Sequence, residues 1–342
     1  MRILNIMLAQ VRGGVETMSL RYHEAMKPAG IEVLSLGHPE GVLGQNLPPD
    51  DFRPVRALIN HDPLAALTIR RIAREVRPDL ILTHGNRATG ICLLPCLGTA
   101  RRTVQVVHNF RHKGQSGHLR AAICVSASVH DSVRRAHPNL PIYDLANFGP
   151  LSDRPVKPAP QGTVVLGTLG RLHVNKGIDI MIRALASLRA RGLDVRLRIG
   201  GDGPLKDEMV ALVRLLGLEH RVDFDGWVSR AADYLHALDL FVLPSRVEPF
   251  GLVVAESMAA GVPIVATDID GPKEILLDGV LGVLSPKDDP DALAFAIATA
   301  LSDWPATLKK ARAAQTYALT HFSLDAGKRR LVETLNQIAA GL

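Results

Sequence analysis

The chain is poor in aromatic residues and cysteines, and it has no long apolar run. Aromatic residues make up 4% of its 342 residues, which is few for a surface that stacks nucleic-acid bases. The three cysteines, Cys92, Cys96 and Cys124, are odd in number and predict core thiols, not a disulfide framework. No segment approaches the roughly 20 apolar residues that span a bilayer, and the N-terminal stretch is too interrupted for a signal peptide. These absences predict a cytoplasmic protein that is not integral to a membrane.

The size and composition predict two globular domains. One domain holds about 150 residues. A content of 47% hydrophobic and 22% charged residues is typical of a soluble fold.

The net charge of +6 is concentrated in the first half of the chain. Residues 1–150 carry 18 lysines and arginines against 11 acidic residues, and the remainder carries 22 against 23. A basic half indicates an anionic partner, such as an acidic lipid surface, a phosphorylated glycan or nucleic acid. An unoccupied basic surface fits the same charge equally well.

Short apolar runs rich in β-branched residues alternate with amphipathic segments, which is typical of βα units around parallel sheets. Five strands are predicted in the first half, at residues 3–8, 32–36, 80–83, 103–107 and 121–125, and five in the second, at residues 164–169, 195–199, 221–224, 240–243 and 264–266. Four prolines between positions 150 and 160 exclude a helix and predict a linker at residues 151–162. Residues 1–150 and 163–321 are expected to be two Rossmann-like domains, followed by a helix at residues 322–342 that packs back toward the first.

Two glutamates eight positions apart are the strongest candidates for a ligand site. Glu248 follows the strand at residues 240–243, and Glu256 lies about two turns into the helix expected after Gly251. In open parallel sheets ligands bind beyond the carboxyl ends of the strands, so one ligand can meet both side chains. Free N–H groups at the start of that helix suit a phosphate. A solvated carboxylate or a helix cap is the simpler interpretation of each glutamate alone.

Two cations follow the strand at residues 164–169. Arg171 and Lys176 share one loop at a helix start, where they can stabilise the charge on a diphosphate as a bond to it breaks. Taken singly, each is more often a solvated surface residue.

Several motifs occur in a characteristic order along the chain. They are Gly13-Gly14-Val15-Glu16, His108 after a strand, Gly170-Arg171 with Lys176-Gly177, Gly200-Gly201-Asp202-Gly203-Pro204, the stretch at 222–228, and the glutamate pair with Pro249-Phe250-Gly251. Together they resemble the retaining glycosyltransferases of family 4, glycosyltransferase group 1, which have the GT-B fold of two Rossmann-like domains facing a deep cleft. The resemblance covers most of the chain.

The resemblance implies a role for each motif residue. Catalytic roles fall on His108, Arg171, Lys176 and Glu248. Donor-binding roles fall on Gly14, Gly170, Gly203, Val228, Phe250, Gly251, Leu252 and Glu256. On the acceptor side lie Gly13, Glu16, Arg87 and Arg111. Arg171 and Lys176 would hold the diphosphate, Glu256 the ribose and Glu248 the donor sugar, and His108 would orient that sugar.

The resemblance also implies the substrates. The donor would be a nucleoside-diphosphate sugar, with UDP favoured and GDP as the alternative, and neither a cofactor nor a metal would be required. The acceptor would be a cell-envelope glycan or glycolipid such as lipopolysaccharide or exopolysaccharide. Arginines at positions 70, 71, 74 and 77 could give a helix a basic face toward an anionic acceptor or the cytoplasmic surface of the inner membrane, together with the loop at residues 108–120. A simple solvated helix fits nearly as well, and no nucleic-acid partner is expected.

Other classes of protein stay open on the same fold. A catalytically inactive nucleotide-binding scaffold and a sugar-nucleotide isomerase are the alternatives, because fold does not imply function. A nicotinamide-dependent dehydrogenase is disfavoured, since no G-x-G-x-x-G follows either first strand. D-x-D patterns at residues 223–225 and 268–270 are discounted as metal sites. Asp270 stands where many members of the resembled family have a glycine, and the first half is compact for that family.

Overall fold

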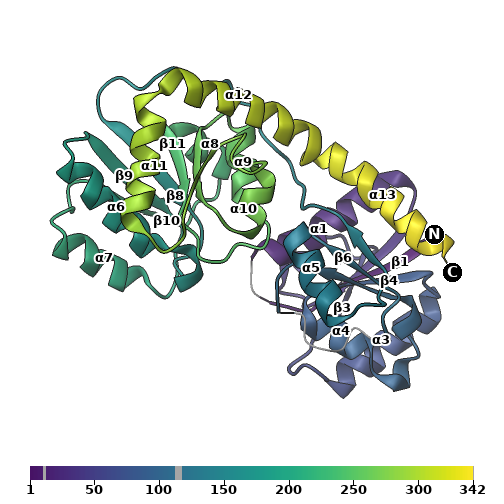
Figure 1. The fold of residues 1–342 in the computed structure, drawn as a ribbon. Coiled ribbons are helices and arrows are strands. Elements are labelled where there is room, and N and C mark those ends of the chain that lie inside the picture. Colours follow the sequence, from purple (N-terminus) through teal and green to yellow (C-terminus); the bar gives the residue numbers. More distant parts are fainter. Residues whose placement is uncertain (11–12, 112–117, 342) are drawn as a thin grey trace. The chain divides into compact units, whose positions relative to one another are not determined.

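The protein divides into two compact units, which a computed structural model describes over residues 1–10, 13–111 and 118–341. The first unit comprises Met1–Gly149 and Leu324–Leu342, and the second comprises Pro150–Ser323. Each is a parallel sheet with helices packed on it (Figure 1). Residues 151–161 have no regular structure. Two parallel-sheet α/β domains are the fold class that the sequence predicts.

The first unit contains a seven-stranded parallel sheet in the order β3-β2-β1-β4-β5-β6-β7. Its strands are β1 (Arg2–Met7), β2 (Glu32–Gly37), β3 (Phe52–Pro54), β4 (Leu80–His84), β5 (Thr103–Val107), β6 (Ala121–Cys124) and β7 (Ile142–Asp144). Its helices are α1 (Gly14–Met26), α2 (Val42–Asn46), α3 (Pro63–Val76), α4 (Asn86–Cys92), α5 (Ala127–Ala136) and α13 (Leu324–Ala340). The strand order reverses between β1 and β4, so a ligand is expected at their carboxyl ends.

The second unit contains a six-stranded parallel sheet in the order β10-β9-β8-β11-β12-β13. Its strands are β8 (Val164–Leu169), β9 (Val195–Gly200), β10 (Val222–Gly226), β11 (Leu240–Leu243), β12 (Ile264–Thr267) and β13 (Val283–Ser285). Its helices are α6 (Ile178–Ala190), α7 (Lys206–Leu215), α8 (Ala231–Ala237), α9 (Leu252–Ala259), α10 (Asp270–Ile275), α11 (Pro290–Ser302) and α12 (Trp304–His321), and a 3-10 turn, η5 (Val174–Lys176), precedes α6. Here the order reverses between β8 and β11.

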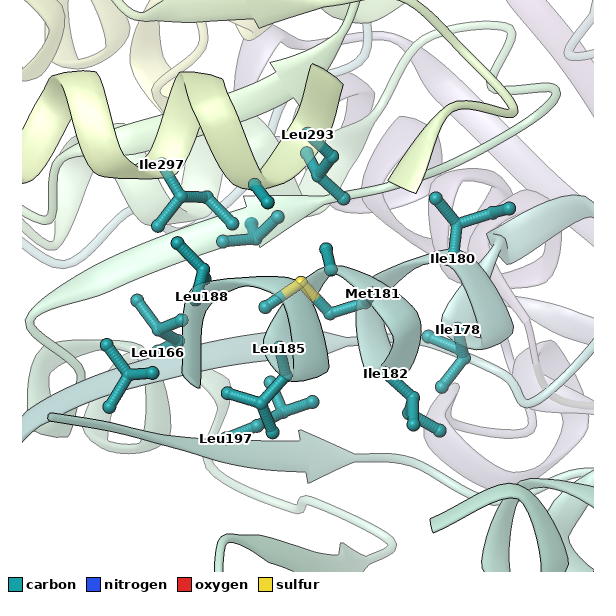
Figure 2. Packing of buried hydrophobic residues seen from close by; sticks show 14 of the residues in the cluster. Leu166, Ile178, Ile180, Met181, Ile182, Leu185, Leu188, Leu197, Leu293 and Ile297 are labelled. Carbon is teal, nitrogen blue, oxygen red and sulfur yellow. The ribbon is translucent and has the colours of Figure 1, made fainter. Parts of the chain in front are cut away.

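Helix α6 fixes the position of the loop that follows β8. Met181, Leu185 and Leu188 recur at helical spacing and are fully buried (Figure 2). They belong to a core cluster that also includes Leu197 of β9 and Ile297 of α11. Burial of side chains of this size stabilises the packing by about 1.5–3 kcal/mol each. The first turn of α6, and the loop before it, are therefore held firmly at the edge of the sheet.

Helix α13 packs in the first unit, although the second unit separates it from the rest in sequence. Its buried residues Leu331 and Leu335 share a core cluster with Tyr22 and Phe148, whose rings stack with centroids 5.7 Å apart. A Cβ at Gly327 would lie 1.9 Å from Cγ of Phe148, so the helix can approach this ring only with glycine there.

All ten predicted strands are present, with ends that differ by at most two residues. The prediction missed β3, β7 and β13, which have three residues each and lie at sheet edges. Three residues are too few to show a periodicity. The prediction for Cys96 was wrong, because its side chain is exposed while Cys92 and Cys124 are buried. Within the described residues, no helix has the length and apolar character needed to span a membrane.

Candidate active site

The loops after β8 and β11 bring two of the predicted catalytic residues into contact. Lys176 ends the η5 turn, and its Nζ donates a hydrogen bond to Oε2 of Glu248, which lies between β11 and α9. The two side chains are 27% and 12% exposed. Since β8 and β11 flank the point at which the strand order reverses, this ion pair lies where open parallel sheets bind ligands.

Arg171 lies in the same loop but has a different environment. Its side chain is exposed, and it forms no hydrogen bond or ion pair with any residue that the structure describes. An arginine in this state can bind an anion without first breaking an internal ion pair. The loop thus offers one unpaired guanidinium and one ammonium that is balanced by Glu248.

Arg246 ties the β11 loop to the start of α6, and sequence analysis missed it. Its guanidinium donates to both carboxylate oxygens of Asp179, at 2.8 and 2.7 Å, to Asp288 at 2.5 Å and to the carbonyl oxygen of Val174 at 2.9 Å. The backbone N–H of Arg246 donates to the carbonyl oxygen of Asn175 at 2.8 Å. The hydrogen bond with Asp179 raises the pKa of Arg246. These contacts of Arg246 therefore fix the loop that carries Glu248 against the segment that carries Lys176.

The glycine-rich loop after β9 packs directly on the β8 loop. A Cβ at Gly201, where φ is +120°, would lie 1.9 Å from the carbonyl oxygen of Gly170. A Cβ at Gly203 would lie 2.4 Å from that of Leu172, whose N–H donates to Asp202 at 3.0 Å. These glycines allow a loop-to-loop contact that any side chain would prevent. The structure thus gives Gly201 and Gly203 a packing role. The donor contacts predicted for Gly170 and Gly203 stay predictions.

Trp227 and Val228 come directly after β10, which pairs with β9. The half-buried Val228 has a methyl group 2.9 Å from where a Cβ of Gly200 would lie, and Trp227 is 74% exposed. An exposed indole next to a glycine-rich loop offers a flat apolar face.

The start of α9 presents backbone groups more than side chains. Gly251 is its N-cap with φ of +96°, and Leu252 is the first helical residue. The side chain of Phe250 is buried and packs edge-on against Phe322, with centroids 5.6 Å apart. A ligand would therefore meet the backbone of this segment, not the ring of Phe250. Glu256, half-buried, lies about one helical turn beyond Leu252, not the two turns that the sequence predicted.

His108 lies at the carboxyl edge of the first sheet, directly after β5. It lines a shallow pocket with Val15, Asn86, Asn109 and Arg111, among other residues. Its Nε2 is 3.0 Å from Nδ1 of His84, at the end of β4, and the two rings stack with centroids 5.3 Å apart. Its Nδ1 is buried and has no hydrogen-bond partner among the described residues. Burial lowers the pKa of His108 to about 4, so the ring is neutral.

A buried polar network continues from His84 into the sheet. Nε2 of His84 is 2.9 Å from Oδ1 of Asn5 on β1. Nδ2 of Asn5 donates to the carbonyl oxygen of Ser19 at 2.9 Å and to Oγ of Ser35 at 3.1 Å. Burial places the pKa of His84 well below its usual value, and neighbouring His108 lowers it further. Sequence analysis missed Asn5 and His84, because both lie inside apolar strands.

The acceptor-side candidates Arg87, Arg111 and Glu16 have different environments. Arg87 donates to the carbonyl oxygen of Ala57 at 3.1 Å, and its Nε is buried without a partner among the residues described. Arg111 is exposed beside the pocket, and its carbonyl oxygen accepts a hydrogen bond from Asn86. Burial raises the pKa of Glu16. One oxygen of its carboxylate would lie 2.8 Å from a Cβ at Gly13, so Glu16 folds back over the exposed start of α1, next to Gly14. Residues 11–12 and the basic positions within 112–117 lie outside the described residues.

Three of the four aspartates in the two D-x-D patterns form ion pairs with basic side chains. Asp223 and Asp225 form ion pairs with Arg196 and Arg198, and Asp268 with Lys273 at 2.9 Å. Asp270, at the start of α10, has φ of +26°, where glycine is the residue without strain. A glycine at this position would be free of that strain.

The fold defines the class of protein. The structure superposes on the crystal structure of Anabaena Alr3699/HepE in complex with UDP and glucose with a TM-score of 0.83, at 24% sequence identity, over 98% of this chain and 100% of that one. It is therefore a GT-B fold, as the sequence predicts.

Family membership follows from the sequence comparisons. Residues 12–142 match the family model described as Glycosyltransferase Family 4, and residues 163–303 match that described as Glycosyl transferases group 1. The GDP-mannose-dependent alpha-(1-6)-phosphatidylinositol monomannoside mannosyltransferase of Mycolicibacterium smegmatis is 34% identical over 293 residues, 80% of this chain and 74% of that protein. The lipopolysaccharide core biosynthesis glycosyltransferase LpsD of Rhizobium meliloti is 30% identical over 263 residues, 75% of this chain and 74% of that protein. The chain belongs to the family 4 glycosyltransferases, and the predicted membership is confirmed.

Proposed function

We propose that the protein transfers a sugar from a nucleoside-diphosphate sugar to a hydroxyl group of a cell-envelope glycan or glycolipid, with retention of configuration. The observation that carries this proposal is the ion pair of Lys176 with Glu248 beside the unpaired Arg171, at the switch point of the second sheet. It combines two cations for a diphosphate with one carboxylate for the sugar. No simple nucleotide-binding function needs that carboxylate.

The proposed reaction breaks the bond between the anomeric carbon and the diphosphate oxygen. Arg171 and Lys176 stabilise the negative charge that develops on the leaving diphosphate, without a metal ion. Glu248 stabilises the positive anomeric carbon, and its hydrogen bond to Lys176 favours this electrostatic role over attack on the sugar. The acceptor oxygen then forms the new bond on the same face, and its proton passes to the departing phosphate. For His108 the proposed role is a hydrogen bond with a sugar hydroxyl group.

The donor is proposed to be a UDP-sugar, with a GDP-sugar as the alternative. Support for UDP comes from HepE, which was crystallised with UDP and glucose, and support for GDP comes from the related mannosyltransferase, which depends on GDP-mannose. Glu256 is the proposed ligand of the ribose hydroxyls, and the backbone of Gly251 and Leu252 that of a phosphate.

The acceptor is proposed to belong to the cell envelope. LpsD acts in lipopolysaccharide core biosynthesis, and the mannosyltransferase is named for a phosphatidylinositol acceptor. The basic first half of this chain suits an anionic acceptor, and with it peripheral contact with the cytoplasmic face of the inner membrane.

A panel of nucleotide sugars tests the proposal. Purified protein is incubated with UDP- and GDP-sugars in the presence and absence of EDTA, and release of the nucleoside diphosphate is measured. We expect release from one donor class, unchanged by EDTA and lost in Lys176→Ala and Glu248→Ala. Release that survives both substitutions would exclude this site. If donors bind but no envelope acceptor gives turnover, the protein is a catalytically inactive nucleotide-binding scaffold. The anomeric configuration of the product tests retention.

A further inference from the structure

An apolar patch lies on the outer face of α3 and on the loop before it. Leu58, Ile59, Leu64 and Leu67 are 86%, 61%, 74% and 59% exposed. Among the described residues eight large hydrophobic side chains are at least 59% exposed, and these four of them fall within ten consecutive positions. Scattered exposed leucines are normal, but a cluster marks a contact surface.

Hydrogen bonds fix the backbone that carries the patch. Asp62 caps α3 by accepting hydrogen bonds from the N–H groups of Leu64 and Ala65 at 3.0 and 3.1 Å, and its other oxygen accepts from Leu58 at 2.9 Å. Arg87 holds the carbonyl oxygen of Ala57 from α4. The backbone is therefore fixed in a conformation that points two apolar side chains of the loop away from the protein, next to those of the helix.

Arginines lie on the same exposed face of α3 as the leucines of the patch. Leu64, Leu67, Arg71 and Arg74 recur at helical spacing and are all exposed, while the opposite face, with Ala65 and Ile69, is buried. Between residues 53 and 77 the chain has six arginines against two carboxylates, Asp62 and Glu75. An apolar tip flanked by arginines matches an anionic bilayer surface, where leucines enter the acyl boundary and guanidinium groups remain at the phosphates.

We infer that Leu58, Ile59, Leu64 and Leu67 insert into an anionic membrane and that Arg71 and Arg74 bind its lipid headgroups. This inference rests on the proposed function for its biological setting, since it names the partner of the basic first unit. It adds apolar insertion to the arginine contacts that the sequence alone indicated.

Vesicle sedimentation tests the docking surface. Wild-type protein is expected to sediment with phosphatidylglycerol/phosphatidylethanolamine vesicles and not with phosphatidylcholine vesicles. Leu64→Gln/Leu67→Gln should weaken binding about tenfold or more at every salt concentration, because two buried leucines are lost. Arg71→Gln/Arg74→Gln should weaken it mainly at low salt, because exposed charges are screened. The matched control is Leu215→Gln/Phe295→Gln, two equally exposed side chains of the second unit.

Three results would overturn the inference. They are no binding of wild type to anionic vesicles, equal loss in the control variant, and a wild-type dimer in solution that Leu64→Gln/Leu67→Gln dissociates, which would assign the patch to a second copy of the chain. Donor turnover with a water-soluble acceptor should be unchanged in Leu64→Gln/Leu67→Gln and in the control variant. Vesicle sedimentation can thus refute the docking surface without affecting the proposed transferase activity, and donor turnover can refute that activity without affecting the docking surface.

A second inference comes from the direction of hydrogen bonds in the first unit. The amide of Asn5 is oriented by the carbonyl oxygen of Ser19, which accepts only, so Oδ1 of Asn5 must accept from Nε2 of His84. A neutral His84 then has a bare Nδ1, which accepts from Nε2 of His108. The remaining nitrogen of His108, Nδ1, is left as an acceptor.

The geometry points to Asn5 and His84 as positioning residues that fix His108 as its Nε2–H tautomer, with Nδ1 free to accept a hydrogen bond from a sugar hydroxyl. The buried, unpartnered Nδ1 of His108 is the atom that this relay prepares. Without the relay the proton could occupy either nitrogen, and the molecules with Nδ1–H could not bind a hydroxyl as acceptor. The hydroxyl contact rests on the proposed function, while the tautomer does not.

Nitrogen-15 NMR of the histidine rings tests the tautomer directly. His108, assigned through His108→Gln, should show Nε2 protonated and Nδ1 bare in wild type. Asn5→Leu should give a mixed tautomer and lower kcat severalfold more than it raises KM. Ser35→Ala is the matched control: it removes another buried partner of Asn5 and should leave the tautomer unchanged. If Asn5→Leu fails to fold, His84→Phe takes its place. An Nδ1–H tautomer in wild type, or one unaffected by loss of Asn5, would refute the relay.

Discussion

Arg246 and Asp179 are joined by two parallel hydrogen bonds of 2.8 and 2.7 Å across 67 positions of sequence. Neither residue belongs to a recognised motif. Their pair, with Asp288 on the far side of the guanidinium, connects the loop that holds Glu248 to the helix that follows Lys176. The ion pair of Lys176 with Glu248 therefore depends on the ion pair of Arg246 with Asp179.

Replacement of Arg246 by lysine should loosen the site without removing a positive charge. Lysine cannot form the forked contact, so we expect the free energy of unfolding to fall by about 1–3 kcal/mol and donor turnover to fall with it. Urea unfolding and release of nucleoside diphosphate measure the two effects. Arg196→Lys is the control, because its pair with Asp223 is 46% and 45% exposed and should be worth under about 1 kcal/mol. Equal effects of both substitutions would contradict the clamp.

Lys176 and Glu248 should behave as one unit in a double-mutant cycle. Lys176→Met and Glu248→Gln are each expected to lower kcat/KM by about a hundredfold or more. The double variant should be little worse than either single variant, because each substitution already breaks the shared ion pair. Steady-state kinetics with the donor found in the panel gives the coupling. Strict additivity would mean that the two residues act separately.

Gly177→Ala should be much more damaging than Gly192→Ala. Both glycines have positive φ, +60° and +81°, at opposite ends of α6. A Cβ at Gly177 would lie 2.0 Å from the carbonyl oxygen of Pro244, whereas none of the described atoms lies within 4 Å at Gly192. We expect a loss of about 1 kcal/mol for Gly192→Ala from backbone strain alone, and about 3 kcal/mol or more for Gly177→Ala. Thermal or urea unfolding measures both.

The first unit should lose stability as the pH falls below about 6.5. Burial lowers the pKa of His84 well below its usual value and that of His108 to about 4. Between about 6.5 and 4 the unfolded chain therefore binds more protons than the folded one, and the free energy of unfolding falls by up to about 1.4 kcal/mol per pH unit for each histidine. Native-state hydrogen exchange in β1 and β4 follows this unit alone. His108→Gln should reduce the slope by one proton, and an unchanged slope would contradict the prediction.

The sequence predicts the fold well because the buried strands are long apolar runs with many β-branched residues. It fails at the sheet edges, where three-residue strands such as β13 form only because a neighbouring strand is already in place. It also cannot tell which face of α3 is covered. Leu64 and Leu67 look like core residues until the packing shows that Ala65 and Ile69 take that role.

The candidate site was predictable where chemistry is local in sequence. Arg171, Lys176 and Glu248 each follow a recognisable strand, so the parallel sheet alone brings their loops to one edge. Arg246 and His84 were not predictable, because their roles depend on partners supplied by tertiary contacts, Asp179 in one case and Asn5 in the other. The pairing of β1 with β4 puts Asn5 and His84 within reach of each other.

The place of α13 in the first unit makes the second unit an insertion within the first. Leu331, Leu335 and Ile338 complete the core around Tyr22 and Phe148 only after the chain has passed through all of Pro150–Ser323. During synthesis the first unit emerges early but closes its core late, whereas the second unit has all its strands and helices in one stretch. A separate first unit would have to be made by splicing residues 1–149 to residues 324–342, and one that simply stops at residue 149 should expose an apolar surface and associate nonspecifically.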